Sequence, residues 1–444
     1  MRRTRGWVAL LFWLASAPAF ADPELDALRE RVRTLEDLQQ RTLAELDRLR
    51  QRVESDPAPV GAPPAGPAPV GLEELAGSES PKRGIDFHGH LATAYYGFDD
   101  TSVVPSSDKS GSHADLAPES SFDVTDLTLF IGVPIADTLY AVADIEYEFG
   151  GQEIDLDQAF VEWDVQRERR LALRLGKFYA PFGIERFYQN APRNPLVDRP
   201  SPYIHVVPGT YSETGVELLG ERELLAGPDV ELEYEVALMN GLGAQLFDSA
   251  RTARQDSDNN SNKTLGGRLG VEYDHWLKLG VSGMVGKYDD ANQDKSYFTG
   301  ADARITWGPL ELRGEYVYAH VDRPDVVDSL GTPCPNAPPL CPGLVPPLTF
   351  LGGSLARHGW YAQAVWSTHP HIPHLLDELD YVLRYDVLDA NDQVTDVLDA
   401  RRIAAGMMLV PVPHFRLKLQ YEITDEIGKE LDNNAFLFEG SVDW

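Results

Sequence analysis

The sequence predicts an all-β protein: a transmembrane antiparallel β-barrel of about sixteen strands, preceded by a coiled-coil helix and a proline-rich linker. Apolar and polar residues alternate from residue 84 to residue 444, which is the period of a strand with two different faces. The links between these strands alternate between short and long, and an export signal stands at the N-terminus. The predicted divisions are residues 1–21, 22–55, 56–83 and 84–444.

Composition and charge exclude some classes of protein. The chain has 444 residues, enough for two or three soluble domains or one large barrel. Its formal net charge is −31, so nucleic acid is not expected as a partner. No window reaches the roughly 18 consecutive apolar residues that a membrane-spanning helix needs. Any crossing of a membrane must therefore be made by strands.

The first 21 residues have the three parts of a signal peptide. Arg2, Arg3 and Arg5 precede an apolar run over residues 7–14, and Ala19-Phe20-Ala21 fits the cleavage rule of small residues around a variable one. We expect residues 1–21 to be removed and the mature protein to leave the cytoplasm.

Residues 22–55 carry a heptad pattern. Apolar residues dominate positions a and d, and Gln39 at a central a position is of the kind that fixes register. The charges at positions g and e match those of a parallel oligomer, for which a trimer is favoured. The alternative is a single amphipathic helix docked on another surface. Residues 56–83 are rich in proline, glycine and alanine and predict an extended, semi-rigid linker.

Sixteen segments of the barrel region alternate between apolar and polar residues. They are residues 85–98, 122–133, 138–149, 155–165, 171–179, 212–220, 230–240, 264–273, 277–288, 297–307, 310–321, 358–368, 380–389, 402–410, 415–424 and 435–444. Links after even-numbered segments are mostly short, whereas the long ones all follow odd-numbered segments. This is the asymmetry expected of periplasmic turns and outer loops.

The polar face of several predicted strands is acidic, and it would face an aqueous lumen. Carboxylates inside a pore favour cations, so these residues are candidates for selectivity, although any watery lumen is polar and simple solvation is the alternative. The acidic residues predicted to line the pore are Asp144, Glu146, Glu148, Glu231, Glu233 and Glu235.

The segment after the fifth strand is the candidate functional loop. Alternation stops at Pro181-Phe182-Gly183, and residues 180–211 then lack periodicity but keep aromatic and basic residues. We expect this loop to fold into the lumen and set its narrowest point, with its arginines facing the acidic ladders of Glu146 and Glu233. Guanidinium groups could hold an anion there by bidentate contacts. The predicted constriction and solute-binding residues are Arg174, Lys177, Arg186, Arg193 and Arg199.

The run Gly176-Lys177-Phe178…Pro181-Phe182-Gly183-Ile184-Glu185 resembles the signature of the phosphate-selective porin O and P family of Gram-negative outer membranes. The motif covers about fifteen residues, while the similarity in architecture extends over residues 84–444. The resemblance implies a sixteen-stranded trimer in which a loop narrows each pore and basic residues guide anions. By this resemblance Lys177 and Arg186 would serve that role.

The remaining motifs predict little chemistry. Cys334 and Cys341 bracket a proline-rich outer loop of an exported chain, so a local disulfide is expected. No cofactor, metal site or catalytic constellation is predicted, and the protein is therefore not expected to be an enzyme.

The expected function is passive diffusion of small ions or solutes, phosphate or other anions among them, through an outer-membrane channel narrowed by the loop 180–211. The expected partners are outer-membrane lipid and two further copies of the chain in a homotrimer, with the coiled coil in the periplasm. Two alternatives remain: a barrel that anchors a partner-binding coiled coil, and a barrel enzyme.

Overall fold

The computed structural model describes residues 85–98, 121–148, 153–166, 170–188, 190–207, 211–225, 229–247, 253–254, 257–322, 354–370, 372, 376–392, 399–427 and 434–444. The predicted signal peptide, coiled coil and linker lie outside these residues, as do Cys334 and Cys341, so these remain predictions. No helix among the described residues has the length and apolar character needed to cross a membrane.

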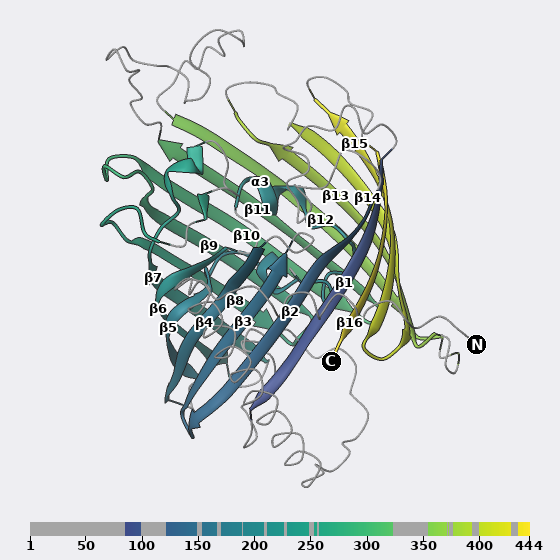
Figure 1. Ribbon diagram of the computed structural model, residues 1–444, viewed down its shortest axis with the longest axis horizontal. Coiled ribbons are helices and arrows are strands. Elements are labelled where there is room, and N and C mark those ends of the chain that lie inside the picture. Colours follow the sequence, from purple (N-terminus) through teal and green to yellow (C-terminus); the bar gives the residue numbers. More distant parts are fainter. Residues whose placement is uncertain are drawn as a thin grey trace, which may run out of the picture. The chain divides into compact units, whose positions relative to one another are not determined.

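The described residues form sixteen strands (Figure 1). Their bounds are β1 Asp86–Phe98, β2 Ser121–Ala136, β3 Leu139–Glu148, β4 Glu153–Gln166, β5 Leu171–Tyr179, β6 Ser212–Leu225, β7 Val230–Met239, β8 Thr264–Tyr273, β9 Leu277–Lys287, β10 Lys295–Trp307, β11 Leu310–Asp322, β12 Ser354–Thr368, β13 Glu378–Asp389, β14 Ala400–Val412, β15 Phe415–Glu426 and β16 Ala435–Asp443. Three short helices accompany them: η4 Glu185–Phe187, α3 Ser201–His205 and η5 Ala244–Phe247.

The strands close into one antiparallel barrel in which each pairs with its neighbours in sequence (Figure 1). The barrel closes between the first and last strands, where the pairing runs from His90 opposite Asp443 to Phe98 opposite Ala435. Beyond that ladder, the Gly89 and Trp444 backbones exchange two hydrogen bonds of 3.2 and 3.0 Å. A closed barrel leaves no unpaired strand edge, which is required of a sheet surrounded by lipid. The predicted fold class is confirmed for the barrel.

Each predicted strand is present, with ends shifted by a few residues. The largest shift is in β6, which continues to Leu225, whereas alternation predicts an end at Gly220. The charged residues after Gly220 interrupt the alternation, so the sequence pattern does not predict this part of the strand. In the structure Glu221 lies opposite Glu233 in the ladder, and its ion pair with Arg170 offsets the repulsion between these two like charges.

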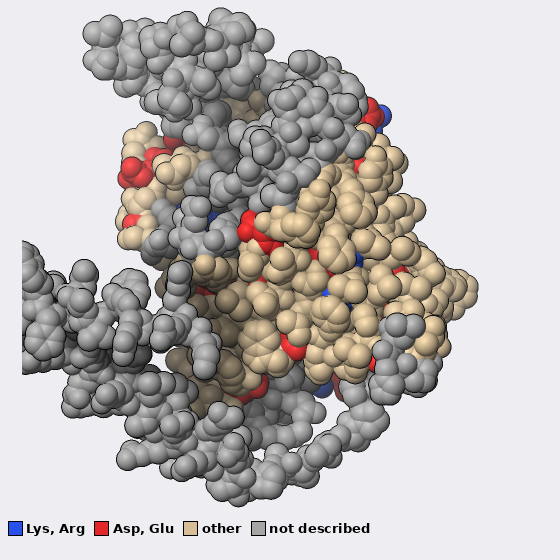
Figure 2. Space-filling view, turned by 45° about the vertical axis from the view of Figure 1, so that its right-hand side comes forward, with Lys and Arg blue, Asp and Glu red and all other residues tan. Residues whose placement is uncertain are grey.

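The two faces of the wall differ as the alternation predicts. On β7, the outward-facing Val236 and Leu238 are 49% and 54% exposed, whereas the inward-facing Glu233 and Glu235 are 5% and 2% exposed. The exposed set includes many large apolar side chains, and the surface in Figure 2 is mostly uncharged, with scattered acidic and basic residues. An apolar outer face and a charged inner face suit a barrel placed between lipid and water.

Candidate functional site

The chain between β5 and β6 leaves the wall and returns to the same place. The Ala180 amide donates to the carbonyl oxygen of Tyr211 at 2.9 Å, which closes the base of the excursion. We call residues 180–207 the inner loop; they include η4 and α3, and the structure describes all of them except residue 189.

Apolar side chains hold the inner loop inside the barrel. Leu196 is buried in a cluster with Val365, Val382 and Ala404, which lie on β12, β13 and β14. Val197 is buried with residues of β1 and β16 at the point of barrel closure. An aqueous surface loop would leave these side chains in water, whereas burying each stabilises the loop by about 1.5–3 kcal/mol. The loop therefore packs on the inner wall.

The break in alternation at Pro181-Phe182-Gly183 is a docking turn. Phe182 packs edge-on against Phe298 of β10, with ring centroids 6.5 Å apart. Gly183 has φ +69°, and a Cβ placed on it would lie 2.0 Å from the Oε1 of Glu315. Only glycine meets both requirements. The turn lets the Gly183 amide donate to the Oγ of Ser282 at 3.0 Å.

Glu315 of β11 fixes the residues after the turn. Its Oε2 accepts hydrogen bonds from the backbone amides of Ile184 and Glu185, at 3.2 and 3.3 Å. Two successive amides at the start of a helical turn form a natural site for a carboxylate. The signature motif thus attaches the inner loop to β9 and β11, four and six strands along the wall from β5.

Ion pairs and an aromatic ring complete this attachment. Arg186 forms an ion pair with Glu235 of β7 at 2.5 Å, and both side chains are buried. Glu185 lies 3.5 Å from Arg313, whose guanidinium sits 3.7 Å from the centroid of the Tyr188 ring. Burial raises the pKa of Glu185, and the positive charge of Arg313 opposes that rise.

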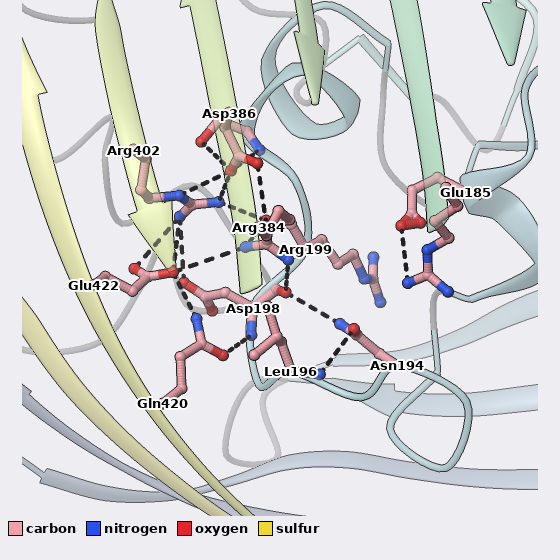
Figure 3. Close-up of polar contacts among 12 residues, drawn as sticks. Glu185, Asn194, Leu196, Asp198, Arg199, Arg384, Asp386, Arg402, Gln420 and Glu422 are labelled. Atoms are coloured by element: carbon pink, nitrogen blue, oxygen red, sulfur yellow. Dashed lines mark hydrogen bonds and ion pairs between the residues drawn. The ribbon is translucent and has the colours of Figure 1, made fainter. Parts of the chain in front are cut away.

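A second attachment holds residues 197–201, and we call its wall residues the clasp: Arg384, Asp386, Arg402, Gln420 and Glu422 (Figure 3). The Oε1 of Gln420 accepts from the amides of Val197 and Asp198, at 2.6 and 3.3 Å. Arg384 and Arg402 both donate to the carbonyl oxygen of Arg199, at 3.2 and 2.7 Å.

The charges of the clasp are balanced within it. Arg402 lies 2.8 Å from Asp386 and 3.4 Å from Glu422. Arg384 lies 3.1 Å from Asp386. Both arginines face inward, and their guanidinium groups donate to loop carbonyl oxygens and form ion pairs with carboxylates.

The five predicted basic residues are placed differently from one another. Arg174 faces inward on β5 but is buried between Glu162 and Glu217, at 2.5 and 3.2 Å, and it stacks on Phe160. These two carboxylates neutralise its charge. Lys177 lies at the end of β5, 3.5 Å from Asp155 of β4.

Arg193 and Arg199 are the predicted basic residues of the inner loop whose side chains reach solvent. Arg193 is exposed and Arg199 is half-buried. In Figure 3 the Arg199 side chain extends away from the clasp, toward the side on which Glu185 lies.

The three predicted acidic residues of β7 are paired with cations. Glu233 meets Lys278 at 2.5 Å and Arg268 at 3.7 Å, and Glu231 lies 3.4 Å from Arg170. On this acidic face of β7, Glu233 already has two cations, and Glu235, two residues further along, pairs with Arg186.

Two further predicted acidic residues lie on β3. Asp144 and Glu146 are buried there, and Asp144 accepts from the amide of Gln158 at 3.3 Å. The side chain of Glu148 lies outside the described residues. No group of three or more His, Cys, Asp or Glu residues in the described part of the chain could hold a metal ion.

Sequence reasoning missed the wall residues that hold the loop. Ser282, Glu315 and Gln420 occupy inward positions of predicted strands, so strand parity places them in the lumen. The alternation along a strand does not predict which of the many inward side chains contacts the loop.

Part of the chain is similar to known proteins. Residues 140–306 match the family model described as phosphate-selective porin O and P, which confirms the resemblance of the motif. An uncharacterized protein of Aquifex aeolicus (strain VF5) is 27% identical over 180 residues, which cover 38% of this chain and 40% of that protein. The chain thus matches less than half the length of that curated relative.

Several solved outer-membrane structures are similar to the chain at low sequence identity. The anion-selective porin from Comamonas acidovorans is 11% identical, with a TM-score of 0.48 over 81% of this chain and 99% of that chain. The outer membrane channel DcaP of Acinetobacter baumannii is 11% identical, with a TM-score of 0.47 over 81% of this chain and 97% of that chain.

Proposed function

We propose that this chain, which matches the phosphate-selective porin O and P family over residues 140–306, is an outer-membrane porin for the passive diffusion of small ions. The observation that carries the proposal is the inner loop, which bonds to inward-facing side chains of β7, β9, β11 and β13–β15. A segment fixed across a lumen narrows it and controls which solutes pass. The loop is proposed to set the narrowest point.

Charge placement supports a preference for anions, phosphate among them. Arg174, Arg186, Arg384 and Arg402 are each neutralised by a carboxylate within 3.2 Å. Arg193 and Arg199 lie on the inner loop with side chains that reach solvent. These two guanidinium groups are the proposed contacts for a permeating anion, since planar guanidinium binds phosphate and carboxylate oxygens in pairs.

Deletion of residues 190–203 should raise the single-channel conductance in a planar lipid bilayer. The deletion removes the clasped half of the inner loop but keeps the docking turn and its bonds to Ser282 and Glu315. Unchanged conductance would show that the loop does not set the narrowest point. Absence of any conductance in the parent protein would favour the anchor or enzyme alternatives and end the proposal of a channel.

Replacing Arg193 and Arg199 together with alanine should shift the reversal potential in a salt gradient toward cations. The loss of two positive charges at the narrowest point lowers the local concentration of anions. Arg401→Ala is the matched control, because Arg401 is exposed and alternates with Arg402, which faces inward on β14. The proposed anion path is refuted if both variants keep the parental reversal potential.

We also propose that the chain assembles as a trimer, with residues 25–53 forming a parallel coiled coil in the periplasm. The heptad pattern and the charges at its g and e positions support this assembly. Chemical cross-linking of the exported full-length chain should trap trimers, and monomers alone at high concentration would count against it.

A further inference from the structure

We propose that Gln420, with Arg384 and Arg402, positions Arg199 and thereby sets the ion preference of the channel. This inference rests on the proposed function and adds a role for wall residues that do not touch the permeating ion. Gln420, Arg384 and Arg402 would be positioning residues, and Arg199 the residue that meets the solute.

The backbone on both sides of the Arg199 side chain is held by the clasp. Gln420 accepts from the amides of Val197 and Asp198. Arg384 donates to the carbonyl oxygen of Asp198 at 2.7 Å, and the next carbonyl, that of Arg199, accepts from both arginines. The amide of Ser201 lies 3.3 Å from the Oδ2 of Asp386. Consecutive peptide groups thus have wall partners, which fixes the direction in which the Arg199 side chain leaves the loop.

Gln420 is suited to this role because both the oxygen and the nitrogen of its side-chain amide form hydrogen bonds. It is 1% exposed, and its Nε2 donates to the Oε1 of Glu422 at 2.6 Å. That bond fixes the orientation of the amide, so its oxygen faces the two loop amides. Removal of this oxygen would leave the two loop amides without this acceptor and would loosen the loop at Val197 and Asp198.

The clasp arginines are not themselves placed to attract an anion. Guanidinium N–H groups of Arg384 and Arg402 donate to the carbonyl oxygens of Asp198 and Arg199. The carboxylates of Asp386 and Glu422 balance their charges. Figure 3 shows the Arg199 side chain directed away from them. The roles of the arginines differ: Arg384 and Arg402 hold the loop, and the half-buried Arg199 is the proposed contact for the solute.

The chain offers a matched control in a second buried glutamine. Gln363 lies at an inward position of β12 and is 2% exposed. Neither its Nε2 nor its Oε1 has a hydrogen-bond partner within the described part of the chain. Gln363→Met therefore makes the same chemical change as Gln420→Met without removing a bond to the loop.

The test measures reversal potential in a salt gradient for four full-length variants: Gln420→Met, Gln363→Met, Arg199→Ala and the double variant Gln420→Met with Arg199→Ala. Folding of each is checked by its resistance to SDS before heating. Gln420→Met should shift the potential toward cations in the same direction as Arg199→Ala, and Gln363→Met should not. Because Gln420 acts through Arg199, the double variant should match Arg199→Ala alone.

The outcomes separate the two proposals. If Arg199→Ala changes the potential and Gln420→Met does not, or if the two effects add in the double variant, the positioning role is overturned while the proposed channel stands. If Arg199→Ala itself leaves the potential unchanged, the anion path through Arg199 fails, and the positioning role fails with it.

Discussion

Replacing Arg174 with alanine should lower the free energy of unfolding by about 3–5 kcal/mol, because the change leaves buried carboxylates without their cation. Glu162 and Glu217 both lie against Arg174, and Glu217 is 0% exposed. The guanidinium also lies 4.8 Å from the centroid of the Phe160 ring.

Urea unfolding of the barrel in detergent micelles measures this effect, with Arg193→Ala as the control for loss of an exposed arginine. The triple change Arg174→Met, Glu162→Gln and Glu217→Gln should recover much of the loss, since a buried ion-pair network can be replaced by neutral groups at little cost. If Arg174→Ala unfolds like the parent and alters the reversal potential, the result would instead support the predicted role of Arg174 at the constriction.

Gly183→Ala should detach the docking turn and raise both the single-channel conductance and its fluctuations. The new Cβ would lie 2.0 Å from the Oε1 of Glu315. Glu315 cannot move away without losing its bonds to the amides of Ile184 and Glu185. We expect a loss of stability about 1–3 kcal/mol larger than the backbone strain alone, the range typical of overpacking.

Gly308→Ala separates steric displacement from backbone strain. Gly308 also has positive φ, +58°, but nothing lies within 4 Å of the position of its Cβ. Its replacement should therefore cost only the left-handed conformation, about 1–2 kcal/mol, and leave the conductance unchanged. Equal conductance and stability in the two variants would contradict a docking role for Gly183.

The barrel and its two faces could be predicted from the sequence because they depend on local alternation. Val236 and Leu238 alternate with Glu235 and Ala237, and one set faces lipid while the other faces the interior. A slip of one residue would reverse every side chain, so parity is strongly determined wherever the two faces meet different solvents. The same holds for the break at Pro181-Phe182-Gly183, since proline and glycine end a ladder through their own backbone chemistry.

The extension of β6 shows the limit of that pattern. Glu221 reads as the start of a polar turn, yet it continues the strand because its side chain pairs with Arg170. Alternation detects strands whose faces differ in polarity, and it fails where both faces carry charge near the end of the barrel.

Which charges meet was decided only by the tertiary structure. Arg186 pairs with Glu235 and not with Glu233, and Gln420 reaches Val197 across 223 residues of sequence. Such contacts depend on the relative offset of neighbouring strands and on the path of the inner loop between them. Parity restricts a side chain to one face of its own strand, whereas a pairing needs the positions of two strands and a loop at once, and a local sequence pattern contains only the first of these.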